Sequence, residues 1–476
     1  MGRPWGAGRG RRRPGRGPPG EPVGDRDQGG AVVFGDMFAR GAVADETGEQ
    51  AWLRAMLDAE AALVHALVRV GLAAPEDAEA VEAARRDGRV DAASAARSAA
   101  DSANPVVPLV RELARAVEGP AARHVHQGAT SQDVMDTAAV LVARRAGGAA
   151  LAEADRAACA LAGLAEEHRR TVMPGRTLLQ QALPTTFGLV AAGWLHAVTG
   201  AADALRTELD RTPAQLGGAA GTLASLGDRG PAVAAAFADR LGLARPALPW
   251  HTDRGPLTAV ASAAARTAAA CGKVSGDLVL LAQTEVGEVA EEAGPGVGGS
   301  SAMPHKRNPV AAVSARACAE QVPGLAATLL TAQIHQPHQR AAGPWQAEWQ
   351  AFDRLLCATG SAAAWTADAL ERLRVDPERM RANLELAGGV PMAERVASDL
   401  APELGRLDAH DLVREACREA AGSGADLAGV LDRRLAGRRT AERIRELLDP
   451  AAYLGAADTF IDAALDAYRT RPERPW

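Results

Sequence analysis

Two long stretches of this chain, residues 184–205 and 258–289, are apolar around almost the whole circumference of a helix. Ala, Val and Leu dominate both of them. Because such a helix has no polar face to turn toward water, it must be surrounded by other helices. Neither stretch is typical of a membrane span, since Arg266, Lys273 and Asp277 interrupt the second and Gly and His interrupt the first. The pattern therefore predicts long helices buried inside a bundle.

Residues 50–71 have an amphipathic pattern of the same helical kind. Their apolar side chains follow spacings of three and four residues. The stripe consists of Trp52, Met56, Leu57, Ala59, Leu63, Val64 and Leu67. Runs of alternating β-branched residues bounded by turn residues are scarce in the rest of the chain. A mainly α protein is therefore expected.

The length of 476 residues exceeds one ordinary hydrophobic core, so two or three domains are expected. Gly119 and Pro120 mark the first boundary, and the break near residues 375–377 marks the second. The expected parts are a tail over 1–30, an N-terminal helical domain over 31–119, a central long-helix domain over 120–374, and a small C-terminal helical domain over 375–476.

The tail over residues 1–30 consists largely of Gly, Pro and Arg and has almost no apolar side chains. A segment of this composition cannot bury enough surface to fold and is expected to be disordered. It has no apolar segment of the kind that a secretory signal requires. Met37, at the opening of the remaining chain, is an alternative start.

Charge and composition exclude several classes of protein. The chain carries 53 Lys and Arg against 59 Asp and Glu, so its body has no positive surplus for nucleic acid. Aromatic residues make up only 3% of it, too few for stacking on single strands. The cysteines form neither paired CxxC spacings nor a disulfide framework, and buried thiols in a reducing cytoplasm are expected. They are Cys159, Cys271, Cys318, Cys357 and Cys417.

Residues 299–309, here named the signature loop, carry the clearest chemical pattern. They run Gly-Ser-Ser-Ala-Met-Pro-His-Lys-Arg-Asn-Pro and follow a Gly-rich lead-in. A serine is a poor base in water, so a loop that uses one must stabilise an alkoxide with backbone N–H groups and a nearby ammonium. Lys306 and Asn308 can then hold a substrate carboxylate. The alternative is a solvated loop between two helices.

Two further segments accompany the signature loop. The first motif, residues 126–133, reads His-Gln-Gly-Ala-Thr-Ser-Gln-Asp, and the second motif, residues 175–184, reads Gly-Arg-Thr-Leu-Leu-Gln-Gln-Ala-Leu-Pro. In this order the three segments resemble the signatures of the fumarase/aspartase superfamily, whose members add to or eliminate from succinate-type dicarboxylates. Over about residues 31–470 the chain is similar to the 3-carboxy-cis,cis-muconate cycloisomerase branch, which includes nitrosuccinate lyases. The segments that carry this similarity are 104–110, 250–254, 343–349 and 392–396.

The resemblance implies a three-domain fold whose central helices pool into a twenty-helix core in a homotetramer. Each active site would be assembled from three chains and bind a small dicarboxylate, without a cofactor or a metal. By motif match, Ser300 abstracts the proton, and Lys306 and Asn308 stabilise the dianion that forms on the adjacent carboxylate. The residues expected to bind the second carboxylate or to make additional contacts are Thr130, Ser131, Gln180, Asn104 and Arg254.

Some of these residues have structural alternatives. Thr130 and Ser131 also suit the N-cap of a helix over residues 134–145, and a lone histidine such as His126 is more often a structural group. The histidine pairs 124/126 and 335/338 lack a third ligand at useful spacing, so zinc is not expected.

The chain departs from the superfamily pattern at three positions. Many relatives have a histidine at the position of Leu178 and a glutamate at that of Val313, and the cycloisomerases commonly have a histidine at Gln181. No obvious general acid therefore remains in the matched motifs. An elimination without an acid requires a leaving group that is stable as an anion, which argues against hydroxide and amide ion.

Two leaving groups meet this requirement. Nitrite would leave from nitrosuccinate to give fumarate, and a carboxylate, whose conjugate acid has a pKa of about 4, leaves when a muconolactone opens. Nitrite elimination is the favoured expectation, and 3-carboxy-cis,cis-muconate cycloisomerase is the alternative. A non-catalytic structural homologue is the alternative from another class, but Ser300, Lys306 and Asn308 are intact.

Overall fold

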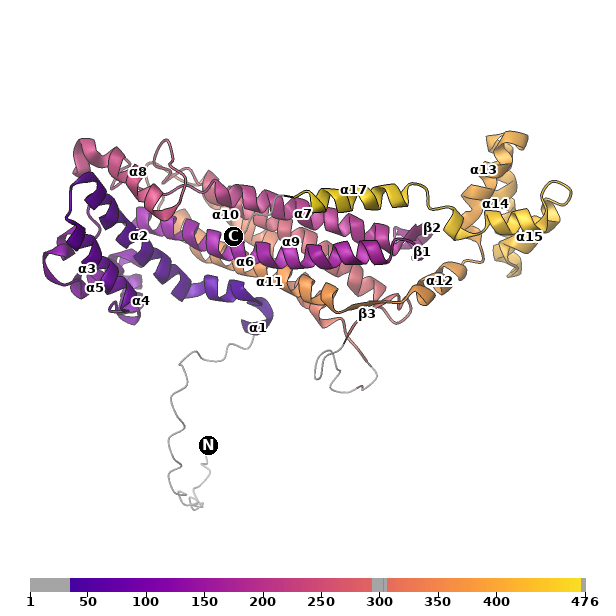
Figure 1. Ribbon diagram of the computed structural model, residues 1–476, viewed down its shortest axis with the longest axis horizontal. Helices are drawn as coiled ribbons and strands as arrows, with labels where there is room; N and C mark the ends of the chain where they lie inside the picture. Colours follow the sequence, from indigo (N-terminus) through magenta and orange to yellow (C-terminus); the bar gives the residue numbers. More distant parts are fainter. Residues whose placement is uncertain (1–34, 293–302, 304–305, 472–476) are drawn as a thin grey trace, which may run out of the picture.

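The computed structural model of the chain describes residues 35–292, 303 and 306–471 (Figure 1). Helices dominate this part, which confirms the expected mainly α class. The expected tail over residues 1–30 lies outside the described residues. Within the described ranges, no helix is both long and apolar enough to cross a membrane.

A bundle of long helices forms the body of the molecule, and its members lie side by side along the long axis of Figure 1. Their contact faces are rich in buried alanine, which lets the helix axes approach closely. The helices are α6 (Ser131–Glu167), α7 (Phe187–Asp210), α9 (Gly255–Leu281), α10 (Val310–Ile334) and α11 (Pro344–Glu371).

The two apolar stretches form helices of this bundle, but their ends differ from the expectation. Residues 184–186 belong to strand β2, and α7 begins only at Phe187, where the Thr186 hydroxyl accepts the N–H of Leu189 at 3.1 Å. Helix α9 ends at Leu281 instead of continuing to residue 289. Gly287 has a positive φ of 61° beyond that end, a conformation that a helix cannot continue through.

The N-terminal helices cover one end of the bundle (Figure 1). The expected helix over residues 50–71 is confirmed as α2, which packs on α6 and α8 and ends in Gly71 at a φ of 78°. The helices of this region are α2 (Gly48–Val70), α3 (Pro75–Arg86), α4 (Ala92–Ser102), α5 (Val106–Ala116) and, from later in the chain, α8 (Gly230–Leu241), while the short α1 (Gly35–Phe38) lies against α10 and α11.

A second hydrophobic cluster, separate from the main core, lies at the opposite end between residues 393 and 448. Helix α17 (Ala457–Arg469) then returns along α7, where Arg170 pairs with Asp458 at 2.9 Å. The division into the expected domains stays a prediction. The other helices of this part are α12 (Pro377–Glu385), α13 (Ala393–Leu404), α14 (Arg406–Ser423), α15 (Leu427–Arg434) and α16 (Ala441–Leu447).

Two small antiparallel sheets flank the far end of the bundle. Strands β1 (Val172–Thr177) and β2 (Gln180–Thr186) form a hairpin directly after α6. Its two turn residues, Leu178 and Leu179, both have positive φ values, 53° and 64°, and both side chains are exposed. The second sheet pairs β3 (Val289–Glu291) with β4 (Leu373–Val375).

Close packing between α6 and α7 leads to a prediction at Gly188. A Cβ at this position would lie 2.7 Å from the Ala165 carbonyl oxygen and from the Arg169 backbone. Since backbone atoms cannot move aside easily, Gly188→Ala should lower the free energy of unfolding by about 1–3 kcal/mol. The matched control is Gly200→Ala in the same helix, where a Cβ meets no atom within 4 Å.

The control should raise the free energy of unfolding by about 0.5–1 kcal/mol, because alanine favours the helix. Urea titration followed by circular dichroism measures both changes. Equal effects of the two substitutions would contradict the packing argument.

Candidate active site

The first motif lies at the start of α6, around the buried carboxylate of Asp133. This carboxylate accepts the backbone N–H groups of Thr130, Gly217 and Gly218, each at 2.9 Å. It also lies 2.7 Å from Nε2 of His251. Thr130 is the N-cap residue and Ser131 the first residue of the helix. Thr130 therefore has the N-cap position that the sequence left as an alternative, whereas Ser131 lies one position inside the helix.

Gly217, beside Asp133, leaves space that the Pro249 and His251 side chains occupy. A Cβ on Gly217 would lie 2.7 Å from the Pro249 side chain and 2.9 Å from Cε1 of His251. Neither Asp133 nor His251 was identified from the sequence as a site residue. Their separation by 118 positions hides the contact from any local pattern.

Arg254 lies in a buried charge cluster next to this motif. The guanidinium binds both oxygens of Asp136 at 2.8 and 2.9 Å, and Oε2 and Oε1 of Glu348 at 2.7 and 3.1 Å. Nη1 also donates to the His251 carbonyl at 3.3 Å. Because these acceptors engage all of its N–H groups, Arg254 has no donor left for a substrate. The structure therefore replaces the expected substrate contact with an ion pair that joins α6, α9 and α11.

The cluster has the electrostatics of a buried ion pair. Only 1% of Arg254 is exposed. Burial acts to lower the pKa of Arg254, but the hydrogen-bonded charges of Asp136 and Glu348 outweigh it and raise the pKa. Burial raises the pKa of Glu348, although the Arg254 charge opposes this. Removal of the cation would leave two carboxylates in a dry interface.

His126 of the first motif and His124, two residues before it, have different surroundings. His124 is buried, with Nδ1 2.7 Å from Oε1 of Gln127 and Nε2 3.2 Å from Asp77. His126 has Nδ1 2.6 Å from Oε1 of Glu60. Burial opposes protonation of His126, but the hydrogen bond and charge of Glu60, with the charge of Asp133, raise its pKa. Among the described residues, no group of three or more His, Cys, Asp or Glu side chains could hold a metal ion.

Asn104 precedes α5 and acts on the local backbone, since its Oδ1 accepts the N–H of Val106 at 2.9 Å. This contact uses the carbonyl half of the amide. The expected substrate contact of Asn104 stays a prediction.

The second motif forms the hairpin of β1 and β2. Gln180 opens β2 and is exposed. Gln181 donates from Nε2 to the Asn383 carbonyl at 2.8 Å, while its buried Oε1 has no hydrogen-bond partner within the described ranges. Arg176 pairs with the fully buried Glu288 at 2.6 Å, which ties the hairpin to the segment ahead of the signature loop.

The signature loop is described only in part. Ser300 and Ser301 lie outside the described residues. Lys306 is exposed and Asn308 is half-buried. The Glu291 carboxylate accepts the N–H groups of Ala311 and Ala312 at 3.0 and 2.8 Å, so strand β3 caps the start of α10 just beyond the loop.

The first and second motifs lie far apart within one chain. Helix α6 has 37 residues, and at 1.5 Å per residue it is about 55 Å long. The first motif precedes this helix and the second follows it. Figure 1 accordingly shows the β1–β2 hairpin and the N-terminal helices at opposite ends of the bundle. A small dicarboxylate cannot touch both motifs of the same chain.

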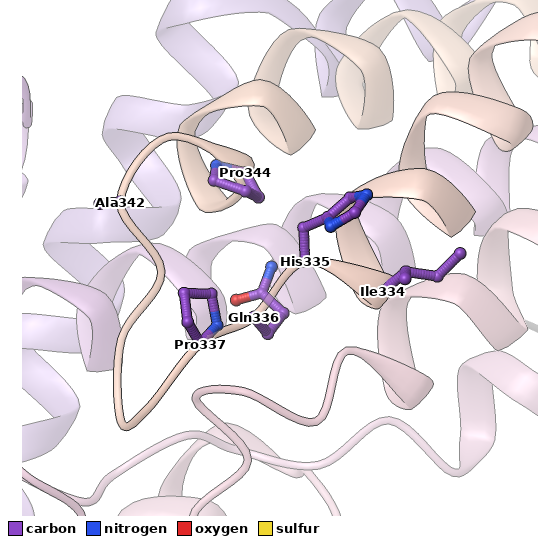
Figure 2. A pocket seen from close by; sticks show the side chains of 6 residues that line it. All are labelled: Ile334, His335, Gln336, Pro337, Ala342 and Pro344. Atoms are coloured by element: carbon purple, nitrogen blue, oxygen red, sulfur yellow. The ribbon is translucent and has the colours of Figure 1, made fainter.

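A pocket of about 380 Å³ lies in the connection between α10 and α11 (Figure 2). None of the expected site residues lines it. Arg340 of the same connection donates to Oε1 of Gln132 at 3.0 Å, so the connection lies at the first-motif end of the bundle. The lining residues are Ile334, His335, Gln336, Pro337, Ala342 and Pro344.

Comparison with known proteins agrees with this fold. A family model described as lyase matches residues 38–324, and one described as adenylosuccinate lyase C-terminus matches residues 389–464. The nitrosuccinate lyase of Streptomyces davaonensis is 47% identical over 430 residues, covering 88% of this chain and 90% of that protein. The 3-carboxy-cis,cis-muconate cycloisomerase of Bradyrhizobium diazoefficiens is 44% identical over 441 residues, covering 91% and 98%.

A solved structure of a related enzyme has the same fold. The 3-carboxy-cis,cis-muconate lactonizing enzyme of Pseudomonas putida superposes with a TM-score of 0.87 at 39% identity, covering 92% of this chain and 99% of that chain. The chain therefore belongs to the fumarase/aspartase superfamily of lyases, in the branch of nitrosuccinate lyase and the 3-carboxymuconate cycloisomerases.

The Arg254 cluster generates a prediction about stability. Arg254→Ala should lower the free energy of unfolding by about 3–5 kcal/mol, because it leaves Asp136 and Glu348 buried without a cation. The control is Arg316→Ala, since Arg316 is half-exposed and pairs with the exposed Glu320 of its own helix. That change should stay within about 0.5 kcal/mol. Denaturant titration measures both, and an unchanged stability of Arg254→Ala together with a raised KM would restore the substrate contact.

Proposed function

We propose that this protein eliminates nitrite from nitrosuccinate to give fumarate. The observation that carries the proposal is that two apolar side chains, Leu178 and Val313, occupy the positions where many relatives have an acid–base pair of histidine and glutamate. Leu178, at a position where many relatives have a histidine, is 97% exposed at the hairpin tip, and Val313, at the glutamate position, is 46% exposed on α10. Neither side chain can protonate a strongly basic leaving group. The 47% identity with a nitrosuccinate lyase supports the same choice.

In the proposed reaction, Ser300 removes a proton from the carbon next to a carboxylate. The electron pair spreads onto that carboxylate, where Lys306 and Asn308 stabilise the dianion. The C–N bond then breaks, its electron pair leaves with nitrite, and the proton passes from Ser300 to solvent. Thr130, Ser131 and Gln180 bind the second carboxylate with neutral donors.

The proposed active site is shared between chains of a cytoplasmic homotetramer. The length of α6 supports this assembly, because the first and second motifs of one chain lie about 55 Å apart. Four copies of the five long helices would supply twenty helices to a common core. Exposed apolar side chains on α10 offer contact surface for that core, and they are Val313, Leu330 and Ile334.

Lactone chemistry is the second candidate. The 44% identity with a cycloisomerase and the fit to the lactonizing enzyme favour it. In this reaction the leaving group is a carboxylate, which also departs without an acid. The two candidates share the proposed proton abstraction by Ser300 and differ in the group that leaves.

Direct assays of the purified protein separate the candidates. With nitrosuccinate we expect nitrite and fumarate in equal amounts, and Ser300→Ala should lower kcat by about 10²–10⁴-fold, because no base remains. Nitrite is measured colorimetrically and fumarate by its ultraviolet absorbance. Turnover of 3-carboxy-cis,cis-muconate without nitrite release would favour the cycloisomerase. A Ser300→Ala variant with unchanged kinetics on whichever substrate is used would remove Ser300 from the mechanism.

A second prediction concerns Lys306. Lys306→Ala should lower kcat and raise KM together, because the ammonium contacts a group present in both the ground and transition states. The sequence has only one other lysine, Lys273, which pairs with Asp277 on its own helix. Lys273→Ala is therefore the matched control and should leave both constants unchanged.

The same pair permits a test without turnover. Fumarate should protect Lys306, but not Lys273, from an amine-reactive reagent, as measured by peptide mass spectrometry. Equal labelling of Lys306 with and without saturating fumarate would exclude it from the binding site.

A further inference from the structure

His126 of the first motif forms a histidine–carboxylate couple with Glu60 of α2, a contact that the sequence did not reveal. Glu60, in the middle of α2, is fully buried. Its Oε1 lies 2.6 Å from Nδ1 of His126, and its Oε2 accepts the backbone N–H of the same residue at 2.9 Å. One carboxylate thus holds both the ring and the main chain of His126.

The buried carboxylate of Glu60 depends on this contact for its stabilisation. A carboxylate without a partner in an apolar helix interface costs several kcal/mol. The neighbours of Glu60 on α2 include the buried Ala59, Ala61 and Leu63, which offer no side-chain donor. His126 supplies two donors, so the ring is fixed in one orientation.

The backbone of His126 has a strained conformation that a glycine would adopt more easily. Its φ is +61°, which costs of the order of 1–3 kcal/mol for a residue other than glycine. A glycine at this position would relieve the strain and keep the backbone N–H on Oε2 of Glu60, but it would leave Oε1 without its partner. The contact between the imidazole and Glu60 thus accompanies a backbone conformation that is unfavourable for histidine.

Nε2, the second ring nitrogen of His126, is the one that can bind a ligand, because Nδ1 is bound to Glu60. With Nδ1 bound to Glu60, Nε2 points away from the carboxylate, and it has no hydrogen-bond partner in the part of the chain that the structure describes. The side chain is 22% exposed. His124, two residues earlier, has both ring nitrogens engaged. Only His126 of this pair can offer a hydrogen bond outward.

The charges around His126 favour its protonated form. Glu60 faces it from α2, and Asp133 acts on it from α6. Burial opposes protonation, but the two carboxylates outweigh it and raise the pKa. A larger share of His126 is therefore imidazolium at neutral pH than of a histidine in water.

We propose that His126 is a catalytic residue that donates a hydrogen bond from Nε2 to the departing anion, and that Glu60 is its positioning residue. The inference rests on the proposed elimination. The substrate carboxylates already have donors in Lys306, Asn308 and the hydroxyls of the first motif, whereas no other residue of the proposed site serves the leaving group. As the C–N bond breaks, its electron pair moves onto nitrite, and the fixed positive charge stabilises that anion.

The chemistry requires no proton transfer to nitrite. A weakly basic anion gains stabilisation from the imidazolium hydrogen bond alone. The positive charge of His126 in the His126–Glu60 couple therefore takes the place of the proton donor that many relatives have in the histidine and glutamate at the positions of Leu178 and Val313.

The test compares substitutions that keep different parts of the imidazole. His126→Asn places an amide near Nδ1, tolerates the positive φ and removes Nε2. His126→Gln places an amide near Nε2. We expect His126→Asn to lower kcat by about 10²-fold, and His126→Gln to recover part of that loss. His410→Asn is the control, because His410 is exposed on α14 and lies beside the exposed Asp411.

Binding and pH profiles add readouts that a purely structural role would not change. Fumarate lacks the leaving group, so its Kd, measured by calorimetry, should be the same in wild type and His126→Asn. Because the protonated form is the active one, wild-type kcat should fall as the pH rises through the raised pKa of His126. This alkaline limb should move to lower pH in Glu60→Gln and disappear in His126→Gln.

Several outcomes would overturn the inference. Equal losses in fumarate affinity and in kcat/KM would make His126 a carboxylate contact. A wild-type kcat with a wild-type alkaline limb in His126→Asn would remove it from the site, and thermal unfolding checks that the variants are folded. If the wild type releases no nitrite but converts 3-carboxy-cis,cis-muconate, the proposed substrate fails, and the same variants then test His126 with that substrate.

Discussion

The length of α6 is the constraint on which the rest of the structure depends. Its 37 residues separate the first motif from the second by about 55 Å. Helices α6 and α7 pack closely in the bundle, since Gly147 and Gly188 leave space for Leu209 and for the α6 backbone. A site that uses both motifs must therefore draw them from different copies of the chain, which is the assembly proposed above.

Buried carboxylates organise the end of the bundle where α6 begins. Each one would be costly alone in an apolar interior, and each is paired with a basic side chain from a distant segment. The pairs are Glu60 with His126, Asp133 with His251, and Asp136 with Arg254. Two of the pairs serve the architecture, because His251 and Arg254 are buried. The His126 side chain is instead 22% exposed, and its Nε2 lies on the side of the ring away from Glu60.

Local patterns predicted much of the fold. The apolar spacing in residues 50–71 is confirmed by α2, and the two apolar stretches are confirmed as bundle helices. Their ends were less accurate, because residues 184–186 pair with β1 and Gly287 turns the chain beyond α9. The role expected for Arg254 was replaced by an ion pair, since Asp136 and Glu348 lie 118 and 94 positions away.

The sequence by itself determined the helical class, the motifs and the superfamily, because helix periodicity and short motifs are properties of neighbouring residues. Only the tertiary structure decided which side chains are paired and which remain available. The contact of Glu60 with His126 spans 66 positions and depends on α2 packing against α6. Contacts of this kind arise from the arrangement of whole helices, which the local pattern of the chain does not encode.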